Sequence, residues 1–145
     1  MPYDEEEAPY VEPDPELDAL AKAVIGACIE VHKRLGPGLD ESLYERALCI
    51  EFRTRGIYFV HQPLIGVSYK GEGIGGRRLD FIVGGRLVVE LKAVEQLAPL
   101  HCAQVRTYLK ITGLKLGLLI NFNSILLKDG IKRIISNSAS SPLSS

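Results

Sequence analysis

The chain has 145 residues, enough for one domain with a single core, and its 46% hydrophobic and 24% charged residues are ordinary for a soluble globular protein. No apolar run approaches the roughly 20 residues that span a bilayer, and the acidic N-terminus lacks an apolar signal region, so we expect a cytoplasmic protein without membrane contact. Three cysteines without metal-like spacing predict reduced thiols rather than a disulfide framework.

The formal net charge of −1 conceals a strong asymmetry. Residues 1–20 contain eight of the 18 acids and no base, which leaves ten acids against 17 bases, or about +7, for the rest of the chain. A basic body with an acidic tail suits a protein that binds nucleic acid. Charge alone is equally compatible with a solvated tail on a moderately charged domain, so it does not decide between these readings.

In the first half of the chain, apolar residues at helical spacing predict two helices, over 15–35 and 41–55. Gly36 is placed to end the first helix, and Asp40 can cap the start of the second. The acidic segment 1–14 is expected to be a disordered tail. After Ile57 the pattern predicts two strands, over 58–62 and 64–69, followed by a flexible glycine-rich turn over 71–76.

The second half of the chain alternates strands with one helix. Two strands, over 77–83 and 87–93, meet at Gly84-Gly85, and a final Ser-rich tail covers 136–145. Between this hairpin and the Ser-rich tail, the sequence predicts a helix over 98–112, a buried strand over 115–122 and a short strand over 130–135. This order of elements predicts one α/β (α+β) domain over 15–135, with a mixed sheet flanked by helices.

The side chains of the 77–83 and 87–93 hairpin can be assigned to faces by counting. A two-residue loop at Gly84-Gly85 would pair Asp80 with Val89 and put Asp80 on the opposite face from Glu90. A three-residue loop, Gly84 to Arg86, would pair Asp80 with Glu90. Three-residue hairpins commonly need a left-handed residue, which glycine supplies without strain. We therefore expect an odd loop, with Asp80, Glu90 and Lys92 on one face.

Asp80, Glu90 and Lys92 interrupt an otherwise apolar hairpin. Buried carboxylates are costly unless they are paired or bind a cation. Metal-assisted hydrolysis of a phosphodiester needs oxygen ligands for Mg²⁺ or Mn²⁺, which two carboxylates can supply. Lys92 could hold the attacking water or stabilise charge on the phosphate. An exposed hairpin face with an ordinary Glu–Lys pair remains the alternative, because short patterns of this kind arise by chance.

Two helices contribute further candidates. Gln104 and Tyr108 lie one turn apart on the third helix, on one stripe with His101, where an amide and a hydroxyl could contact a backbone phosphate. Tyr108 as a core aromatic is the competing interpretation.

The start of the second helix carries the pattern Gly38-x-x-Glu41-x-x-Tyr44. Glu41 could merely complement the helix dipole, or it could supply a third acid to a metal site. Glu30 and His32 near the end of the first helix are weaker candidates for ligands.

These motifs, in this order, resemble the PD-(D/E)XK nuclease superfamily, and more closely a small family named for its GxxExxY motif. Gly38, Glu41 and Tyr44 match the naming motif, and Gln104 and Tyr108 match the QxxxY motif of RecB-like members. Leu79 stands where a proline usually precedes the strand aspartate. The resemblance covers about residues 17–135.

The resemblance implies a restriction-endonuclease-like fold and a Mg²⁺-dependent (or Mn²⁺-dependent) nuclease, acting on DNA rather than RNA, in repair or defence. Glu41, Asp80 and Glu90 would be metal ligands, and Lys92 would be the catalytic lysine. Gln104, Tyr108 and Tyr44 would contact the substrate strand. A second copy of the chain or a larger protein could extend the small DNA footprint. The alternative is a catalytically silent nucleic-acid-binding or accessory module with the same fold.

Overall fold

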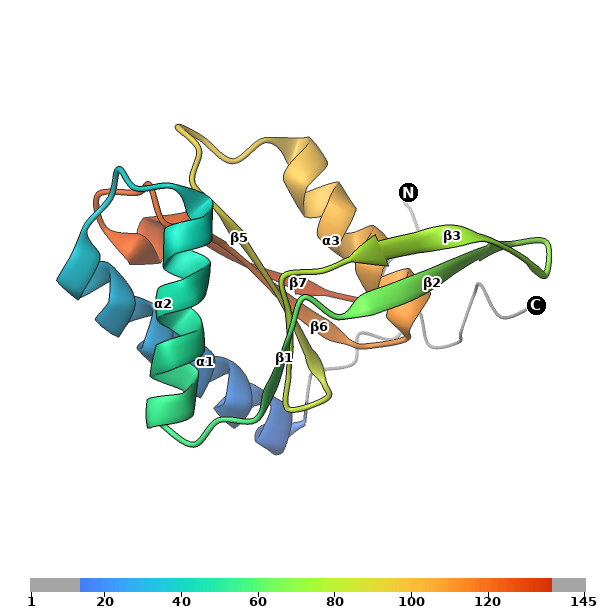
Figure 1. Cartoon of the computed structure of the whole chain (residues 1–145), viewed down its shortest axis with the longest axis horizontal. Coiled ribbons are helices and arrows are strands. Elements are labelled where there is room, and N and C mark those ends of the chain that lie inside the picture. Colours follow the sequence, from blue (N-terminus) through green and yellow to red (C-terminus); the bar gives the residue numbers. More distant parts are fainter. Residues whose placement is uncertain (1–13, 137–145) are drawn as a thin grey trace, which may run out of the picture.

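The computed structural model describes residues 14–136, so the expected tails lie outside the described residues except for Asp14 and Ser136 at their inner ends. Within this range the order of elements is the expected one: two helices, several strands, a helix and two further strands. The chain forms a mixed sheet with helices on both faces, as the sequence predicts (Figure 1). None of the helices in the described range combines the length and the apolar character that crossing a membrane requires.

Two helices open the chain, α1 over Pro15–Leu35 and α2 over Glu41–Thr54. The Asp14 side chain caps α1 by accepting the backbone N–H of Leu17 at 2.8 Å. Gly36 closes this helix with a positive φ of 74°, which glycine adopts without strain. Asp40 occupies the N-cap position of α2 as expected, but its side chain makes no cap hydrogen bond.

The main sheet has five strands in the order β1-β4-β5-β6-β7. Only β5 and β6 are parallel, and helix α3 connects them, as a crossover between parallel strands requires. The remaining neighbours are antiparallel. The elements are β1 Phe59–His61, β4 Phe81–Val83, β5 Leu87–Lys92, α3 Pro99–Thr112, β6 Leu116–Asn121 and β7 Ile131–Ile135, with a short 3₁₀ helix, η2, over Leu127–Gly130.

Helices α1 and α2 cover one face of the sheet and α3 covers the other (Figure 1). Leu87, Val89 and Leu91 of β5 pack in the core on the α1–α2 side, whereas Val88 packs on the α3 side. Since side chains alternate along a strand, Glu90 and Lys92 share the face of Val88. All six residues of β6 are buried, as its apolar sequence predicts for a strand covered on both faces.

One segment of the sequence prediction is wrong. Residues 71–76 do not form a flexible turn, because Glu72–Arg78 is a strand, β3, that pairs with β2 over Leu64–Tyr69. The predicted strand 77–83 is therefore two strands, β3 and β4, which belong to different sheets. The sequence does not predict β3 because its repeated glycines interrupt the alternation of apolar and polar residues that is typical of a strand. The β2–β3 pair forms a separate arm that projects from the body (Figure 1).

Candidate active site

The β4–β5 hairpin has the three-residue loop expected from the need to place Asp80 and Glu90 on one face. Val83 lies opposite Leu87 and Phe81 lies opposite Val89, so Gly84 to Arg86 form the loop. Gly84 and Gly85 both have positive φ, at 61° and 70°. Asp80 immediately precedes β4 and is therefore brought next to Glu90, on the same face of the hairpin.

Asp80 and Glu90 are tied together by reciprocal bonds to the backbone. The Asp80 N–H donates to Glu90 Oε2 at 2.7 Å, and the Leu91 N–H donates to Asp80 Oδ2 at 2.8 Å. Each carboxylate thus accepts one amide hydrogen bond across the hairpin, which fixes its orientation. Each also has a second oxygen that these bonds do not use, and Glu90 is 5% exposed. Asp80 also shares a side-chain hydrogen bond with Glu45 of helix α2.

Helix α2 adds two further acids, and we call Glu41, Glu45, Asp80 and Glu90 the carboxylate cluster. Burial raises the pKa of Glu90 to about 8, helped by the nearby negative charge of Asp80. Burial and the charge of Asp80 likewise raise the pKa of Glu45 to about 8. The pKa of Glu41 is raised by burial and then by Asp80. The acids of α2 therefore lie close enough to the hairpin to repel its carboxylates.

Lys92 and Tyr108 border the carboxylate cluster, and the Tyr108 ring is 4% exposed and packs in the core on the α3 side, as the competing interpretation predicts. The positive charge of Lys92 partly offsets the upward shifts in the pKa of Glu41 and of Glu90, so its amine lies near both. Burial raises the pKa of Tyr108, and the charge of Glu90 adds to the shift, whereas hydrogen bonding to Gln104 opposes it. The structure thus brings the predicted hairpin residues, Glu41 and the two residues of the QxxxY motif to one place.

Glu45 and His61 complete these surroundings, and the sequence interpretation missed both. Glu45 Oε2 is buried and has no hydrogen-bond partner among the described residues, and it lies 3.5 Å from His61 Nε2. Glu45 follows Glu41 by four residues, which places both on one helical stripe and was a readable signal. His61 arrives through β1, whose residue pairing places it opposite Phe81, beside Asp80. That long-range pairing gives no local signal.

Tyr44 does not fit the expectation of direct substrate contact, because it is fully buried. Its hydroxyl donates to the Gly36 carbonyl at 2.6 Å and accepts the Leu39 N–H at 3.0 Å, and its ring stacks on Phe122. These contacts hold the loop that leads into α2. Tyr44 therefore positions the helix that carries Glu41.

The two candidate histidines also have local structural partners. His101 Nδ1 accepts the Ala98 N–H at 3.0 Å and so caps the start of α3. His32 Nε2 lies 2.8 Å from the Ser124 carbonyl, and Glu30 pairs with Arg34 along α1. These partners explain the three residues without a ligand role.

The residues present suit a hard divalent cation. Among residues 14–136, no three His, Cys, Asp or Glu side chains converge closely enough to form a complete metal-binding group. Mg²⁺, however, is usually held by one or two carboxylates together with waters and substrate phosphates. Asp80 and Glu90 provide such a pair, and Glu45 adds a buried oxygen, Oε2, that has no hydrogen-bond partner among residues 14–136. That Glu41 joins them as a direct ligand stays a prediction.

Comparison with known proteins identifies similarity over most of the chain. Residues 18–134 match the family model described as the PD-(D/E)XK nuclease superfamily. Among solved structures, the chain is similar to an alkaline exonuclease from Laribacter hongkongensis, with 15% identity and a TM-score of 0.47, over 88% of this chain and 72% of that one. No curated protein sequence matches significantly.

Proposed function

Because the chain belongs to the PD-(D/E)XK nuclease superfamily, we propose that it is a metal-dependent nuclease whose site is built from Asp80, Glu90 and Lys92. The proposal rests mainly on two hydrogen bonds across the hairpin, beside a lysine. The Asp80 N–H donates to the Glu90 carboxylate, and the Leu91 N–H donates to the Asp80 carboxylate. A pair of oriented carboxylates next to a cationic side chain suits the hydrolysis of a phosphodiester. On sequence grounds, DNA is the expected substrate and the cytoplasm the expected location.

Each side chain has a task that follows from its position. Asp80 and Glu90 would hold a divalent cation, which supplies Lewis-acid polarisation of the phosphate and a more acidic bound water. Lys92, near Glu90, would stabilise the negative charge that develops on the phosphate. Glu41 and Glu45 border the same space, where either could accept a proton from water or bind the cation through water. Gln104 and Tyr108 would steady the strand being cut.

The direct test is cleavage of labelled single- and double-stranded DNA and RNA by the purified protein with Mg²⁺ or Mn²⁺. We expect metal-dependent cleavage, and we expect Glu90→Gln to reduce its rate by about a hundredfold or more, because the hairpin carboxylate is lost while the side-chain shape is kept. Glu30→Gln is the matched control, since Glu30 pairs with Arg34 on α1 and should leave the rate unchanged.

Two outcomes contradict the proposal. If none of the four substrates is cut with either ion, the chain is the catalytically silent binding module that the fold also allows. If Glu90→Gln and Glu30→Gln cleave equally well and both remain folded by circular dichroism, the nuclease site lies elsewhere. Size-exclusion chromatography with light scattering on the same samples tests whether a second copy of the chain takes part.

A further inference from the structure

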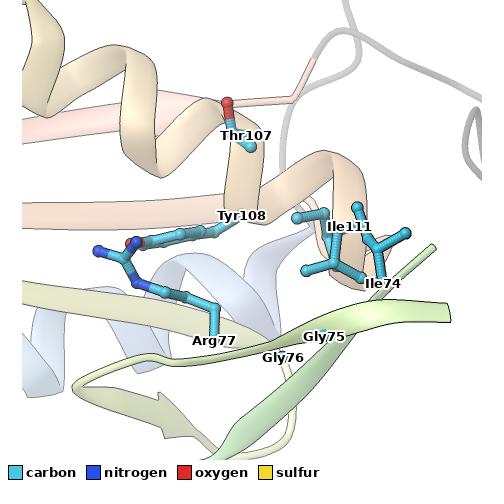
Figure 2. Close-up of a pocket in the computed structure, with 8 residues that line it drawn as sticks. Ile74, Gly75, Gly76, Arg77, Thr107, Tyr108 and Ile111 are labelled. Atoms are coloured by element: carbon cyan, nitrogen blue, oxygen red, sulfur yellow. The ribbon is translucent and has the colours of Figure 1, made fainter. Parts of the chain in front are cut away.

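An open cavity of about 370 Å³ lies between β3 and α3. Its apolar end is formed by Ile74 of β3 and Ile111 of α3, which lie side by side, while Tyr108 and Arg77 form the other end (Figure 2). The volume is at the small end of the range for small-molecule pockets, roughly 300–1,000 Å³. A single ring system fits such a space better than a folded segment of protein does.

Glycine keeps the strand side of this cavity open. Gly75 has a φ of 144°, which side chains rarely adopt, and a Cβ added there would meet no atom within 4 Å. The strand backbone is therefore directly accessible from the cavity. Ile74, beside it, is 66% exposed, so an apolar side chain stands in solvent at the edge of the cavity. An apolar ligand would remove this side chain from water.

Tyr108 links the cavity to the carboxylate cluster. Its ring, 4% exposed, lies at the base of the cavity. Burial and then the charge of Glu90 raise the pKa of its hydroxyl, so this one side chain lies between the two sites. The guanidinium of Arg77 lies 5.6 Å from the centre of that ring. In the described part of the chain, no carboxylate lies within salt-bridge distance of Arg77. Its charge is thus available to a phosphate that passes between the cavity and the cluster.

We infer that this cavity receives one unstacked nucleobase of the strand being cut, so that the substrate class is unpaired nucleic acid. The inference rests on the proposed nuclease function and names the substrate of the same site. Unpaired bases pack on apolar side chains and on guanidinium planes. Here the exposed Ile74 supplies the first and Arg77, backed by the buried Tyr108 ring, supplies the second. A paired base inside a duplex is stacked on both faces and cannot enter a concave site. The backbone phosphate next to the bound base would contact Arg77.

The test measures binding in Ca²⁺ buffer by fluorescence anisotropy, with a fluorescein-labelled single-stranded DNA and a blunt duplex of the same length. We expect the wild type to bind the single strand more tightly. Ile74→Ser should weaken that binding by about fivefold, because it removes apolar contact with the base. The matched control is Ile50→Ser on α2, where the isoleucine is similarly exposed at 59% and lies outside the cavity.

A strand with a single abasic site, placed at each position in turn, identifies the bound base. One position should weaken wild-type binding by about fivefold, and the same site should have no further effect on Ile74→Ser. A second variant, Thr107→Glu, puts a charge on the α3 wall and should also weaken single-strand binding, whereas Thr54→Glu on α2 should not. Thr107 is exposed, so this change does not disturb the core.

Three results would overturn the inference: tighter binding of the duplex, equal binding by cavity and control variants, or abasic effects that persist in Ile74→Ser. Cleavage of the same DNAs with Mn²⁺ separates this inference from the proposed function. A wild type that cuts DNA while the cavity variants bind normally contradicts only the base site. A wild type that binds single strands through the cavity but never cuts them contradicts only the nuclease.

Discussion

Glu45 carries a carboxyl group in surroundings that oppose its ionisation. Its Oε2 atom is buried without a hydrogen-bond partner in residues 14–136, and the charges of Asp80 and Glu41 lie nearby. An ionised carboxylate in such a position lacks solvation and is repelled by its neighbours. The neutral acid avoids both costs, which is why the pKa of Glu45 rises to about 8. The free energy of unfolding should therefore depend on pH.

The metal-free protein should lose stability as pH rises from about 5 to about 9. In this window the folded state holds protons on Glu45 and Glu90 that the unfolded chain has already released, because their pKa is about 8 in the fold and near 4.5 outside it. The stabilisation is fully present below the unfolded pKa and disappears as pH passes the folded one. Thermal melts in EDTA across this range should show a fall of roughly 5 °C or more.

Glu45→Gln provides the matched test of that slope. A neutral amide cannot ionise, so the variant should melt at a higher temperature than the wild type at high pH and should show a flatter pH dependence. Glu51→Gln is the control, because Glu51 lies on the same helix, is partly exposed and pairs with Arg55 just after the helix end. If melting temperature falls with pH equally in the wild type and in Glu45→Gln, the proton taken up in the folded state is not on Glu45.

The β4–β5 hairpin is the element that determines whether the acids meet. Its loop, Gly84 to Arg86, lies against α1, where a Cβ added at Gly84 would come within 2.8 Å of Leu20 Cδ2. At Gly85 a Cβ would meet nothing within 4 Å. Both glycines have positive φ, so alanine strains the backbone at either position. Only at Gly84 does the new side chain also collide with the helix.

Gly84→Ala should therefore destabilise the protein more than Gly85→Ala does. We expect a cost of about 1–2 kcal/mol at Gly85 from backbone strain alone, and about 1 kcal/mol more at Gly84 from crowding. Urea unfolding of the two variants measures the difference. Adding Leu20→Ala to each variant tests the cause, since it should remove the extra loss of stability from crowding only in the Gly84 variant. Equal free energies of unfolding for the two single variants would contradict the proposed contact.

The sequence predicts this hairpin well and the neighbouring arm poorly, for physical reasons. In the hairpin, the two-residue period of strand side chains and a glycine turn leave one loop length that unites Asp80 with Glu90. In the arm, Glu72–Arg78 contains three glycines and no buried face, so its strand exists through pairing with β2. Glu45 resembles any solvated helix charge, and only the tertiary fold buries it.

At the scale of the whole molecule, the two helical layers converge on the end of one hairpin. Helix α2, whose sequence includes Glu41 and Glu45, packs on one face of the sheet, and α3, whose sequence includes Tyr108, packs on the other (Figure 1). The residue pairing of β1, β4 and β5 fixes where these contributions meet. Short sequence patterns on these elements identify the candidate residues, but the side chains come together only when the layers pack.

The net charge of the described residues favours a polyanionic partner. All 17 basic residues lie in the described range, against 13 of the 18 acids, so this part carries a net charge of +4. Because several acids are gathered in the carboxylate cluster, positive charge predominates elsewhere. Binding that neutralises phosphates releases counterions and weakens as salt concentration rises. For about three phosphate contacts to a single strand, affinity should fall about twentyfold between about 50 and about 200 mM salt.

Arg77→Ala should lower this salt dependence as well as the affinity. Removing one phosphate contact on a single strand reduces the slope of log K against log salt by about 0.7, whereas loss of an apolar contact leaves the slope unchanged. Lys22→Ala is the control, because Lys22 is exposed on α1 and paired with Asp18. Anisotropy titrations at several salt concentrations measure both slopes.

If Arg77→Ala lowers affinity but keeps the wild-type slope, Arg77 acts by packing on Tyr108 rather than by binding phosphate. Ile74→Ser, which carries no charge change, should produce that unaltered slope, so the two variants together separate the base contact from the phosphate contact.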